Sequence, residues 1–472
     1  MTMSPALLSL PQILVALPVL LSLACFTVST QPRGTNSHSQ AEMLQSMSMA
    51  SLEKETLFHV METMSSDRDW RSSYPDPCIP GSSWPGIECK PGSDNHLHVT
   101  RLDFGVAPNP TCKNTATFPS EVFDLPHLQS LFFFNCFKTT KTSLSMPPPA
   151  RKPAAYASLQ QLSLKSNPSL IGPVPPHISS LFSLQVLTLS QNHLHGKIPE
   201  GISGLTSLIH LDLSYNSLAG SIPAQLGSLS SLTGLDLSYN SLTGSIPPSI
   251  GQLSLLQKLD LSSNSLSGSV PESLENLSFL AFLALSNNKL SGQLPKGLPK
   301  LQNLQYFIMD DNPMFVPLPS QLGRLSKLQE LRLANSGYSG SIPGSFAWLA
   351  NLTTLSLENN RLTGEIPGVL SGLSRMYHLN LSRNMLAGVV PFSAGFIKRL
   401  GRNLDLSGNP GLCLNGSESS VSISVGVEVC AGNRSASSMQ QPLRSSARAP
   451  SPLFSNFPLL PGCLALWSVT VF

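Results

Sequence analysis

The sequence predicts an α/β repeat solenoid, in which short strand-and-turn units stack into a curved right-handed superhelix with disulfide-stapled caps. Three observations support this prediction. The pattern LxLxxN recurs at a constant step of 24 residues from Asn192 to Asn384. Leucine, serine, asparagine, glycine and proline dominate the composition, which is typical of a repeat array. Six cysteines flank the regular units without interrupting them, as staples at the ends of an extracellular array would.

Each unit is expected to combine a short strand with a turn anchored by asparagine. In HLDLSYN, Leu211 and Leu213 point inward from the strand, and the residues beside them alternate outward. Asn216 then turns inward, where its side chain can bond backbone groups that the bend leaves unpaired. One unit cannot bury its leucines alone, so the array needs neighbours and caps. The asparagine ladder comprises Asn167, Asn192, Asn216, Asn240, Asn264, Asn288, Asn312, Asn360, Asn384 and Asn409, with Ser336 at the one missing position.

The first turns follow the pattern less closely. Segments 99–105 and 128–136 keep the strand phase, and Cys136 occupies the asparagine position. Cysteine is a known substitute there, so Cys136 is either a ladder residue or the disulfide partner of Cys112. Residues 138–157, rich in proline, threonine and lysine, interrupt the count and are expected to form a surface excursion. The solenoid should span residues 99–412, in about 12–13 turns.

The N-terminal end indicates an exported protein. Residues 1–30 carry no charged side chain and contain a long apolar stretch followed by small residues, which predicts a secretory signal peptide. Residues 31–98 should form an N-terminal cap and residues 413–432 a C-terminal cap. Two predicted disulfides, Cys78–Cys89 and Cys413–Cys430, each close a short loop in one of these caps.

The C-terminal end is typical of a glycolipid (GPI) anchor signal. A Ser/Pro-rich linker covers residues 433–456, and residues 457–472 form an apolar tail without charge. Ser445 begins a run of small residues and is the predicted attachment site, since a spacer and tail of ~8–12 and ~10–20 residues follow such sites. A single membrane span is the alternative, but a spanning helix needs ~20 residues and two prolines interrupt this tail.

The block LxGxIP follows most of the ladder asparagines, as in LAGSIP and LTGEIP, and it resembles the plant-specific class of leucine-rich repeats. The segment DWRSSYPDPCIPGSSWPGIEC resembles the N-terminal cap of plant receptors of that class. Blocks such as SNPSLIGPVP, YFIMDDNPMF and NSGYSGSIP resemble the plant receptor-like protein family, and the resemblance runs from about Glu53 to Cys430. It implies a cell-surface receptor that lacks a kinase of its own and works with a partner receptor kinase.

Catalytic, metal and nucleic-acid functions find no support in the sequence. DFG occurs at residues 103–105, but no HRD loop or lysine-bearing strand motif accompanies it, which argues against a kinase. A zinc site is not expected, because the sequence has no CxxC pattern and no histidine at ligand spacing from a cysteine. The net charge is only +3 and no basic run is present, so nucleic acid is not an expected partner. No enzymatic activity and no cofactor are expected.

One repeat departs from the others in a way that predicts a binding surface. In QYFIMDDNPMFVPLP, Phe307 and Met309 take the inward positions and Asn312 keeps the ladder, so the repeat should fold normally. Its outward positions carry aromatic, aliphatic and acidic side chains where other repeats carry serine or aspartate. Such a composition is typical of a binding hot spot, although cross-strand packing alone is the alternative. The predicted binding residues, with those added by the adjacent strands, are Phe282, Tyr306, Ile308, Asp310, Asp311, Glu330 and Arg332.

Five Asn-x-Ser/Thr sequons are candidate N-glycosylation sites. They are Asn276, Asn351, Asn380, Asn415 and Asn433. Asn380 lies between two inward leucines, hence on the strand face, where a glycan would shield the C-terminal end of the concave surface.

The leading functional hypothesis is a plasma-membrane receptor-like protein on the extracellular face, which binds a peptide ligand or the ectodomain of a receptor kinase for signalling in development or immunity. A secreted apoplastic inhibitor of microbial cell-wall-degrading enzymes is the first alternative, because plants build such inhibitors on the same repeat. A wall-associated scaffold is the second. The apolar C-terminal tail favours the receptor, since a secreted inhibitor has no use for it.

Overall fold

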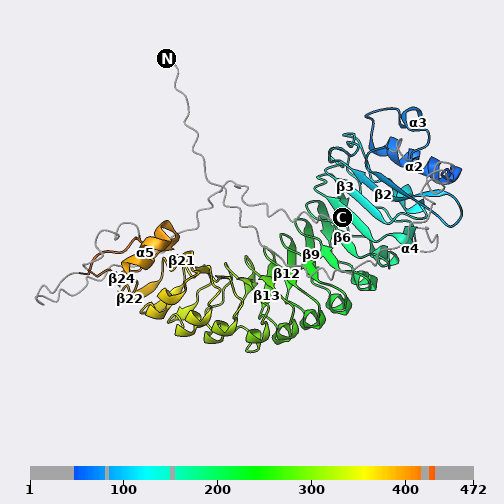
Figure 1. The fold of residues 1–472 in the computed structure, drawn as a ribbon. Coiled ribbons are helices and arrows are strands. Elements are labelled where there is room, and N and C mark those ends of the chain that lie inside the picture. Colours follow the sequence, from blue (N-terminus) through cyan, green and yellow to red (C-terminus); the bar gives the residue numbers. More distant parts are fainter. Residues whose placement is uncertain (1–46, 80–83, 149–154, 416–424, 431–472) are drawn as a thin grey trace, which may run out of the picture.

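The computed structural model describes residues 47–79, 84–148, 155–415 and 425–430. These residues form a curved solenoid whose long sheet lines the inner, concave side (Figure 1). The prediction of a leucine-rich solenoid is therefore confirmed. Within the described residues, every helix is too short or too polar to cross a lipid bilayer. The predicted signal peptide, Ser/Pro-rich linker, apolar tail and Ser445 lie outside these residues.

A 14-stranded sheet forms the concave face. Its first two strands pair antiparallel and all the others pair parallel, because each 24-residue unit returns the chain to the same side of the solenoid. Its strands, in spatial order, are β1 (Ile87–Pro91), β2 (Leu97–Phe104), β3 (Ser130–Phe134), β4 (Gln161–Lys165), β6 (Val186–Thr188), β8 (His210–Asp212), β10 (Gly234–Asp236), β12 (Lys258–Asp260), β14 (Phe282–Ala284), β16 (Tyr306–Ile308), β17 (Glu330–Arg332), β19 (Thr354–Ser356), β21 (His378–Asn380) and β23 (Leu404–Asp405).

The asparagine ladder joins consecutive repeats as predicted. The Asn288 side-chain amide donates to the carbonyls of Leu261 and Leu285 at 3.0 and 3.1 Å, and its oxygen accepts from the Leu266 amide at 3.0 Å. Each asparagine thus satisfies backbone groups of its own turn and of the preceding repeat. Ser336 is too short to repeat this pattern in full: its hydroxyl accepts from the Asn312 amide, and its carbonyl accepts from the Met314 amide.

Beyond the turns, the chain forms two smaller sheets along the flank. The gap between them falls at the unusual repeat, between β15 and β18. The first sheet contains β5 (Ile171–Gly172), β7 (His193–Gly196), β9 (Ser217–Ser221), β11 (Ser241–Gly244), β13 (Ser265–Gly268) and β15 (Lys289–Leu290). The second contains β18 (Ser339–Gly340), β20 (Arg361–Gly364), β22 (Met385–Val389) and β24 (Gly411–Cys413).

Short 3₁₀-helices, rather than α-helices, form the outer side of the regular repeats. Each follows a proline whose carbonyl accepts a hydrogen bond from the amide three residues later, as Pro175 does from Ile178. These helices are η1 (Ser120–Asp124), η3 (Pro176–Ser180), η4 (Glu200–Gly204), η5 (Ala224–Ser228), η6 (Pro248–Gln252), η7 (Glu272–Asn276), η8 (Leu298–Lys300), η9 (Ser320–Arg324), η10 (Gly344–Trp348) and η11 (Gly368–Gly372).

Helices and disulfides close both ends of the leucine core. At the N-terminal end, α2 (Ser51–Met64) and α3 (Trp70–Ser73) cover the first strands, with Trp70 and Trp84 packed edge to face at 5.3 Å. At the C-terminal end, α5 (Ala394–Leu400) and η12 (Gly401–Asn403) precede β23. The disulfides are Cys78–Cys89, Cys112–Cys136 and Cys413–Cys430.

The two interpretations of Cys136 are both correct. It is bonded to Cys112, and it is also fully buried at the ladder position, where its backbone amide donates to the Asn167 side chain at 2.7 Å as the Asn167 amide does to Asn192.

The expected surface excursion at residues 138–157 is partly wrong. Leu144 and Tyr156 are buried, the latter in α4 (Ala155–Ser158), and its ring packs edge to face on Phe123 at 5.7 Å. The excursion therefore contributes apolar side chains to the core near the first repeats.

Candidate ligand-binding surface

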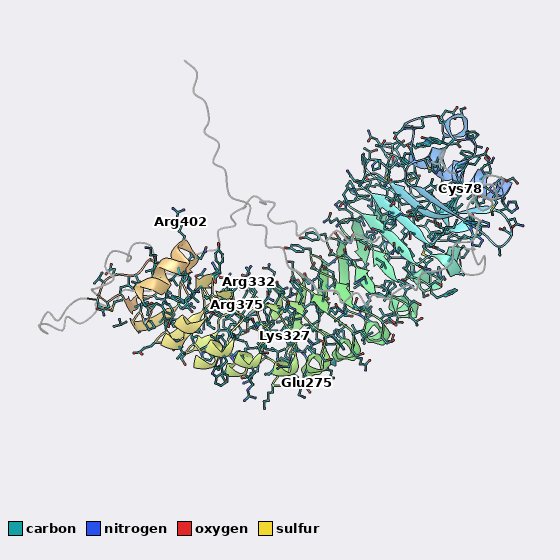
Figure 2. All side chains as sticks on the ribbon, viewed as in Figure 1. Cys78, Glu275, Lys327, Arg332, Arg375 and Arg402 are labelled. Carbon is teal, nitrogen blue, oxygen red and sulfur yellow. A yellow bond between two sulfur atoms is a disulfide. The ribbon has the colours of Figure 1, made fainter. Side chains whose placement is uncertain are left out.

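The unusual repeat keeps its register, so its outward residues form one patch with those of its neighbours. Tyr306 pairs with Phe282 on one side and Glu330 on the other, while Ile308 pairs with Arg332. Phe307 and Met309 are fully buried, as their inward positions predict. In Figure 2, Arg332 lies toward the inner side of the curve, whereas Glu275 of η7 lies on its outer side. We call the residues Phe282, Tyr306, Ile308, Glu330 and Arg332 the central patch.

The aromatic part of the central patch is half-buried and linked by ring contacts. The rings of Phe282 and Tyr306 lie 5.9 Å apart at 40°, and the Lys258 ammonium lies 5.7 Å from the Phe282 ring. The Tyr306 hydroxyl lies 3.4 Å from the Gln329 side-chain oxygen. Burial, followed by the nearby Glu330 carboxylate, raises the pKa of Tyr306. The phenol therefore stays neutral: its proton is donated to Gln329, and its oxygen can accept from a ligand.

Asp310 does not lie on the surface, contrary to the sequence-based expectation. Its side chain is buried, because the chain bends after β16 and brings it under Arg332. One carboxylate oxygen accepts from Arg332 Nε at 2.8 Å and the other from the Ala334 amide at 2.8 Å. Burial raises the pKa of Asp310, and the Arg332 charge opposes this rise. Asp310 thus holds the guanidinium in place and does not present its own charge to a partner.

The charged edge of the central patch is only partly available. Arg332 Nη1 lies 3.8 Å from Glu330, and the Arg332 side chain is 46% exposed. Burial is the main cause of the raised pKa of Glu330. Asp311 is exposed in the turn with φ of 56°, a position that other repeats fill with tyrosine, serine, asparagine, glutamine or arginine. It therefore lies beside the patch, at the edge of the strand face.

Phe315 and Arg361 form a flanking contact that the sequence-based reasoning missed. Phe315 takes a φ of 49°, one residue before the position where neighbouring repeats have glycine with positive φ. Its ring is 59% exposed, and the Arg361 guanidinium lies over it at 5.1 Å. The signal was available: an aromatic residue precedes Val316, which replaces the usual glycine.

Asp212, Asp236 and Asp260 form an acidic column on adjacent strands beside the central patch, and their carboxylates accept hydrogen bonds from the turns that follow. Asp212 and Asp236 each accept from the amide and hydroxyl of the serine two residues later, as in Asp236 with Ser238 at 3.1 and 2.7 Å. Burial and the Asp236 charge raise the pKa of Asp260 to about 6. Asn380 makes the same hydrogen bonds to Ser382 without a charge. The column is thus explained by the repeat itself.

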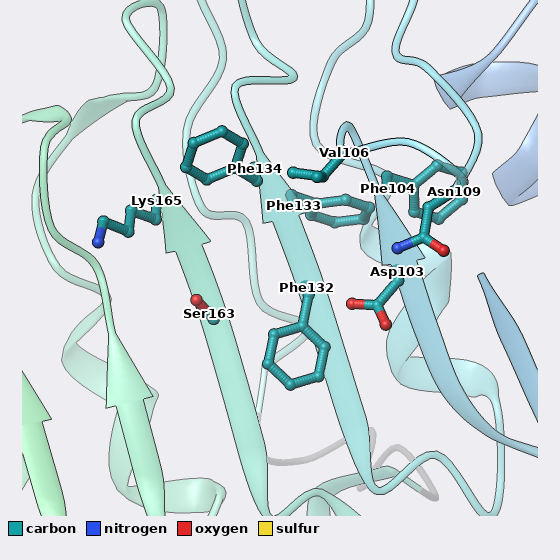
Figure 3. Close-up of a pocket in the computed structure, with 9 residues that line it drawn as sticks. All are labelled: Asp103, Phe104, Val106, Asn109, Phe132, Phe133, Phe134, Ser163 and Lys165. Carbon is teal, nitrogen blue, oxygen red and sulfur yellow. The ribbon is translucent and has the colours of Figure 1, made fainter. Parts of the chain in front are cut away.

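A second apolar feature lies at the N-terminal end of the same face (Figure 3). A hollow of about 200 Å³ opens between the loop after β2 and strands β3 and β4. It is lined by Asp103, Phe104, Val106, Asn109, Phe132, Phe133, Phe134, Ser163 and Lys165. Ligand pockets for small molecules usually measure ~300–1,000 Å³, so this hollow suits a single side chain. The run of three phenylalanines was the available sequence signal.

The sequons differ in accessibility. Asn276 and Asn415 are exposed. Asn351 is half-buried: its amide donates to the Ser326 carbonyl and its oxygen accepts from Arg375, both at 2.8 Å. Asn380 lies half-buried on β21, as its position between two leucines predicted. Asn433 lies outside the described residues. Among the residues that the structure does describe, no group of three or more His, Cys, Asp or Glu side chains could hold a metal ion.

Comparison with known proteins agrees with this architecture. Models of the leucine-rich repeat match residues 183–205, 207–229, 231–253, 255–277, 279–301 and 326–386. Receptor like protein 29 of Arabidopsis thaliana is 63% identical over 147 residues, which cover 31% of each chain. Protein TOO MANY MOUTHS of Arabidopsis thaliana is 37% identical over 139 residues, 28% of this chain and 26% of that protein. The matches thus span less than about a third of these relatives' length.

A solved structure of a plant peptide hormone receptor, RGFR1 in complex with RGF2, is similar in fold. It superposes with a TM-score of 0.56 at 32% identity, over 67% of this chain and 47% of the receptor chain.

Proposed function

Because this chain belongs with the plant leucine-rich-repeat receptor-like proteins, we propose that it is a cell-surface receptor that binds a peptide or the ectodomain of a receptor kinase through the central patch. The related receptor RGFR1 was solved in complex with RGF2, which supports recognition of a peptide by this fold. The chain would have no kinase of its own and would signal through its partner.

One observation carries the proposal: three large side chains, Phe282, Tyr306 and Ile308, share one face with an arginine that a buried aspartate holds in place. Apolar area beside a fixed guanidinium is the composition of protein-binding hot spots. Cross-strand packing explains the contact between Phe282 and Tyr306, but it does not require Arg332 to be oriented by Asp310.

The proposal includes an extracellular location at the plasma membrane. The three disulfides support an oxidising compartment. The lipid anchor rests on the sequence of residues 433–472. Treating intact plant cells with a phosphatidylinositol-specific phospholipase should release the protein; a protein that stays in the membrane argues for the single span.

The binding test uses the secreted protein and a double substitution, Tyr306→Ala with Ile308→Ser. Crosslinking on plant cells, followed by mass spectrometry, should identify a receptor-kinase ectodomain or a secreted peptide with wild-type protein and lose it with the variant. Leu255→Ser with Phe279→Ala is the matched control, since both residues are exposed and lie 24 residues apart in adjacent repeats. Equal capture by wild type and the patch variant would contradict the proposal.

The alternative, an inhibitor of microbial wall-degrading enzymes, uses the same concave face. It predicts that the purified protein lowers the activity of a fungal polygalacturonase at a stoichiometric ratio. Inhibition without capture of any receptor kinase or peptide would favour this alternative.

A further inference from the structure

The hollow at the N-terminal end of the concave face exposes apolar side chains where regular repeats carry polar ones. Phe134 is 40% exposed and Val106 is 49% exposed. The positions of the regular repeats that correspond to Phe134 hold Ser214, Ser238 and Ser262 instead. Exposed apolar area gathered around a depression is a mark of a binding site.

The hollow is built by backbone register and does not depend on flexible side chains alone. Phe132 lies between Asp103 of β2 and Ser163 of β4, and Phe134 pairs with Lys165. The Arg101 guanidinium lies 4.6 Å from the Phe132 ring and is bound to Asp103 at 2.7 Å. These contacts fix the floor of the hollow and one of its sides.

The loop that carries Val106 and Asn109 forms the opposite side. It approaches β3 closely at Gly105, where a Cβ atom would lie 1.8 Å from the Phe134 carbonyl oxygen. The Gly105 amide also donates to the Pro110 carbonyl at 2.8 Å, which closes the loop on itself. The hollow is therefore preformed.

Two charged side chains, Asp103 and Lys165, line the hollow. Asp103 is paired with Arg101. The ammonium of Lys165 makes no ion pair or hydrogen bond with any residue that the structure describes, although it lines the hollow. An apolar depression with one unpaired cation at its edge complements an apolar group followed by an anion.

We propose that the hollow binds a large aromatic or aliphatic side chain of an extended peptide, whose neighbouring aspartate or glutamate pairs with Lys165. This inference rests on the proposed function, recognition of a peptide by the concave face, and adds a second anchoring site to the central patch. The volume of about 200 Å³ accommodates one such side chain.

The distance between the two sites sets the length of peptide that can occupy both. The strand order β3-β4-β6-β8-β10-β12-β14-β16 separates Phe132 from Ile308. At ~4.8 Å per step, this path measures roughly 34 Å, which an extended chain of about ten residues spans. A ligand that reaches both sites therefore carries two apolar residues about ten positions apart.

Selection of random dodecapeptides, displayed on phage, against the intact secreted protein tests the proposal. The enriched consensus should contain a large apolar residue within two positions of an aspartate or glutamate. Selection on the Lys165→Glu variant should replace the acidic residue by lysine or arginine. Lys138→Glu is the matched control, since Lys138 is exposed outside the hollow.

Affinity for one consensus peptide, measured by fluorescence anisotropy, gives the second readout. Phe134→Ser should weaken binding about tenfold, while Phe182→Ser, at an even more exposed phenylalanine elsewhere, should leave it unchanged. The inference is overturned if no apolar–acidic consensus is enriched, or if Lys165→Glu retains both the consensus and the affinity. If the inference fails in this way, the proposed function would still be supported by a Tyr306→Ala, Ile308→Ser variant that no longer captures the cellular partner.

Discussion

The Arg332 guanidinium is held by a buried carboxylate. Its Nε lies 2.8 Å from Oδ2 of Asp310, and Asp310 is only 4% exposed. The pair joins β17 to the turn after β16. Because Asp310 also accepts from the Ala334 amide, the carboxylate links two consecutive repeats. The arginine on the binding surface and the stability of the solenoid therefore depend on the same contact.

Removing Arg332 should destabilise the protein. Arg332→Ala leaves a buried carboxylate without its cation, and we expect a loss of about 1–3 kcal/mol in the free energy of unfolding. Asp310→Asn with Arg332→Ala should recover part of that loss, because the neutral amide oxygen can still accept from Ala334. Urea unfolding followed by circular dichroism measures both. Arg375→Ala, which removes an exposed arginine, is the control; equal losses for Arg332→Ala and Arg375→Ala would disprove this role of Asp310.

The N-terminal cap should be more stable in mild acid. His98 is buried between two carboxylates, with Nδ1 2.7 Å from Glu53 and Nε2 3.0 Å from Asp94, and its ring lies 3.9 Å from that of His127. Burial opposes the charge, but the hydrogen bonds that the imidazole donates to Asp94 and Glu53 outweigh it and raise the pKa of His98 above 6.5. Since the folded pKa exceeds the unfolded one, this stabilisation is complete below the unfolded pKa and is lost as pH rises through the folded pKa.

The matching measurement is the melting temperature of wild type and His98→Gln across the pH range. The difference between them should be largest near about pH 5.5 and should shrink by about pH 8.5. His177→Gln, at an exposed histidine, should show no such trend. A difference that stays constant with pH would mean that folding leaves the pKa of His98 unchanged.

The period of the repeat predicted the buried positions well, because a fixed step assigns each residue a side of the strand. Phe307, Met309 and Asn312 lie where the ladder requires. Asp310 was misplaced because alternation holds only within the strand, and this residue lies just after β16. The hollow depends on the path of the loop after β2, which no periodicity specifies.

The close approach at Gly105 makes a matched pair of glycine substitutions informative. Both Gly105 and Gly292 have positive φ, of 103° and 83°. A Cβ at Gly292 meets nothing within 4 Å, so Gly292→Ala should cost only the backbone strain, about 1–2 kcal/mol. Gly105→Ala adds a clash with the Phe134 carbonyl and should lower the melting temperature further. Similar melting temperatures for the two variants would show that the backbone at Gly105 has room for a Cβ beside the Phe134 carbonyl.

Cys136 combines two roles that substitutions can separate. Losing a disulfide typically costs ~2–5 kcal/mol, so Cys112→Ala with Cys136→Ala should be strongly destabilised. Cys112→Ala with Cys136→Asn should recover part of this loss, because asparagine is the usual ladder residue at that position. Thermal melts compare the two variants.

Peptide mapping without reduction should find all three disulfides in the wild-type protein. Free thiols at Cys78 and Cys89 would contradict the cap structure.

Glycosylation should follow the accessibility of the acceptor amides. Asn276 and Asn415 are exposed and should carry glycans, whereas Asn380 should not. Its side-chain oxygen accepts from the amide and hydroxyl of Ser382 at 3.1 and 2.7 Å, which fixes it against the concave sheet. Enzymatic deglycosylation in heavy-oxygen water, followed by peptide mass spectrometry, marks each occupied asparagine. A mark at Asn380 would place a glycan two strands from Arg332, and Asn380→Gln should then change the affinity of the central patch for its partner.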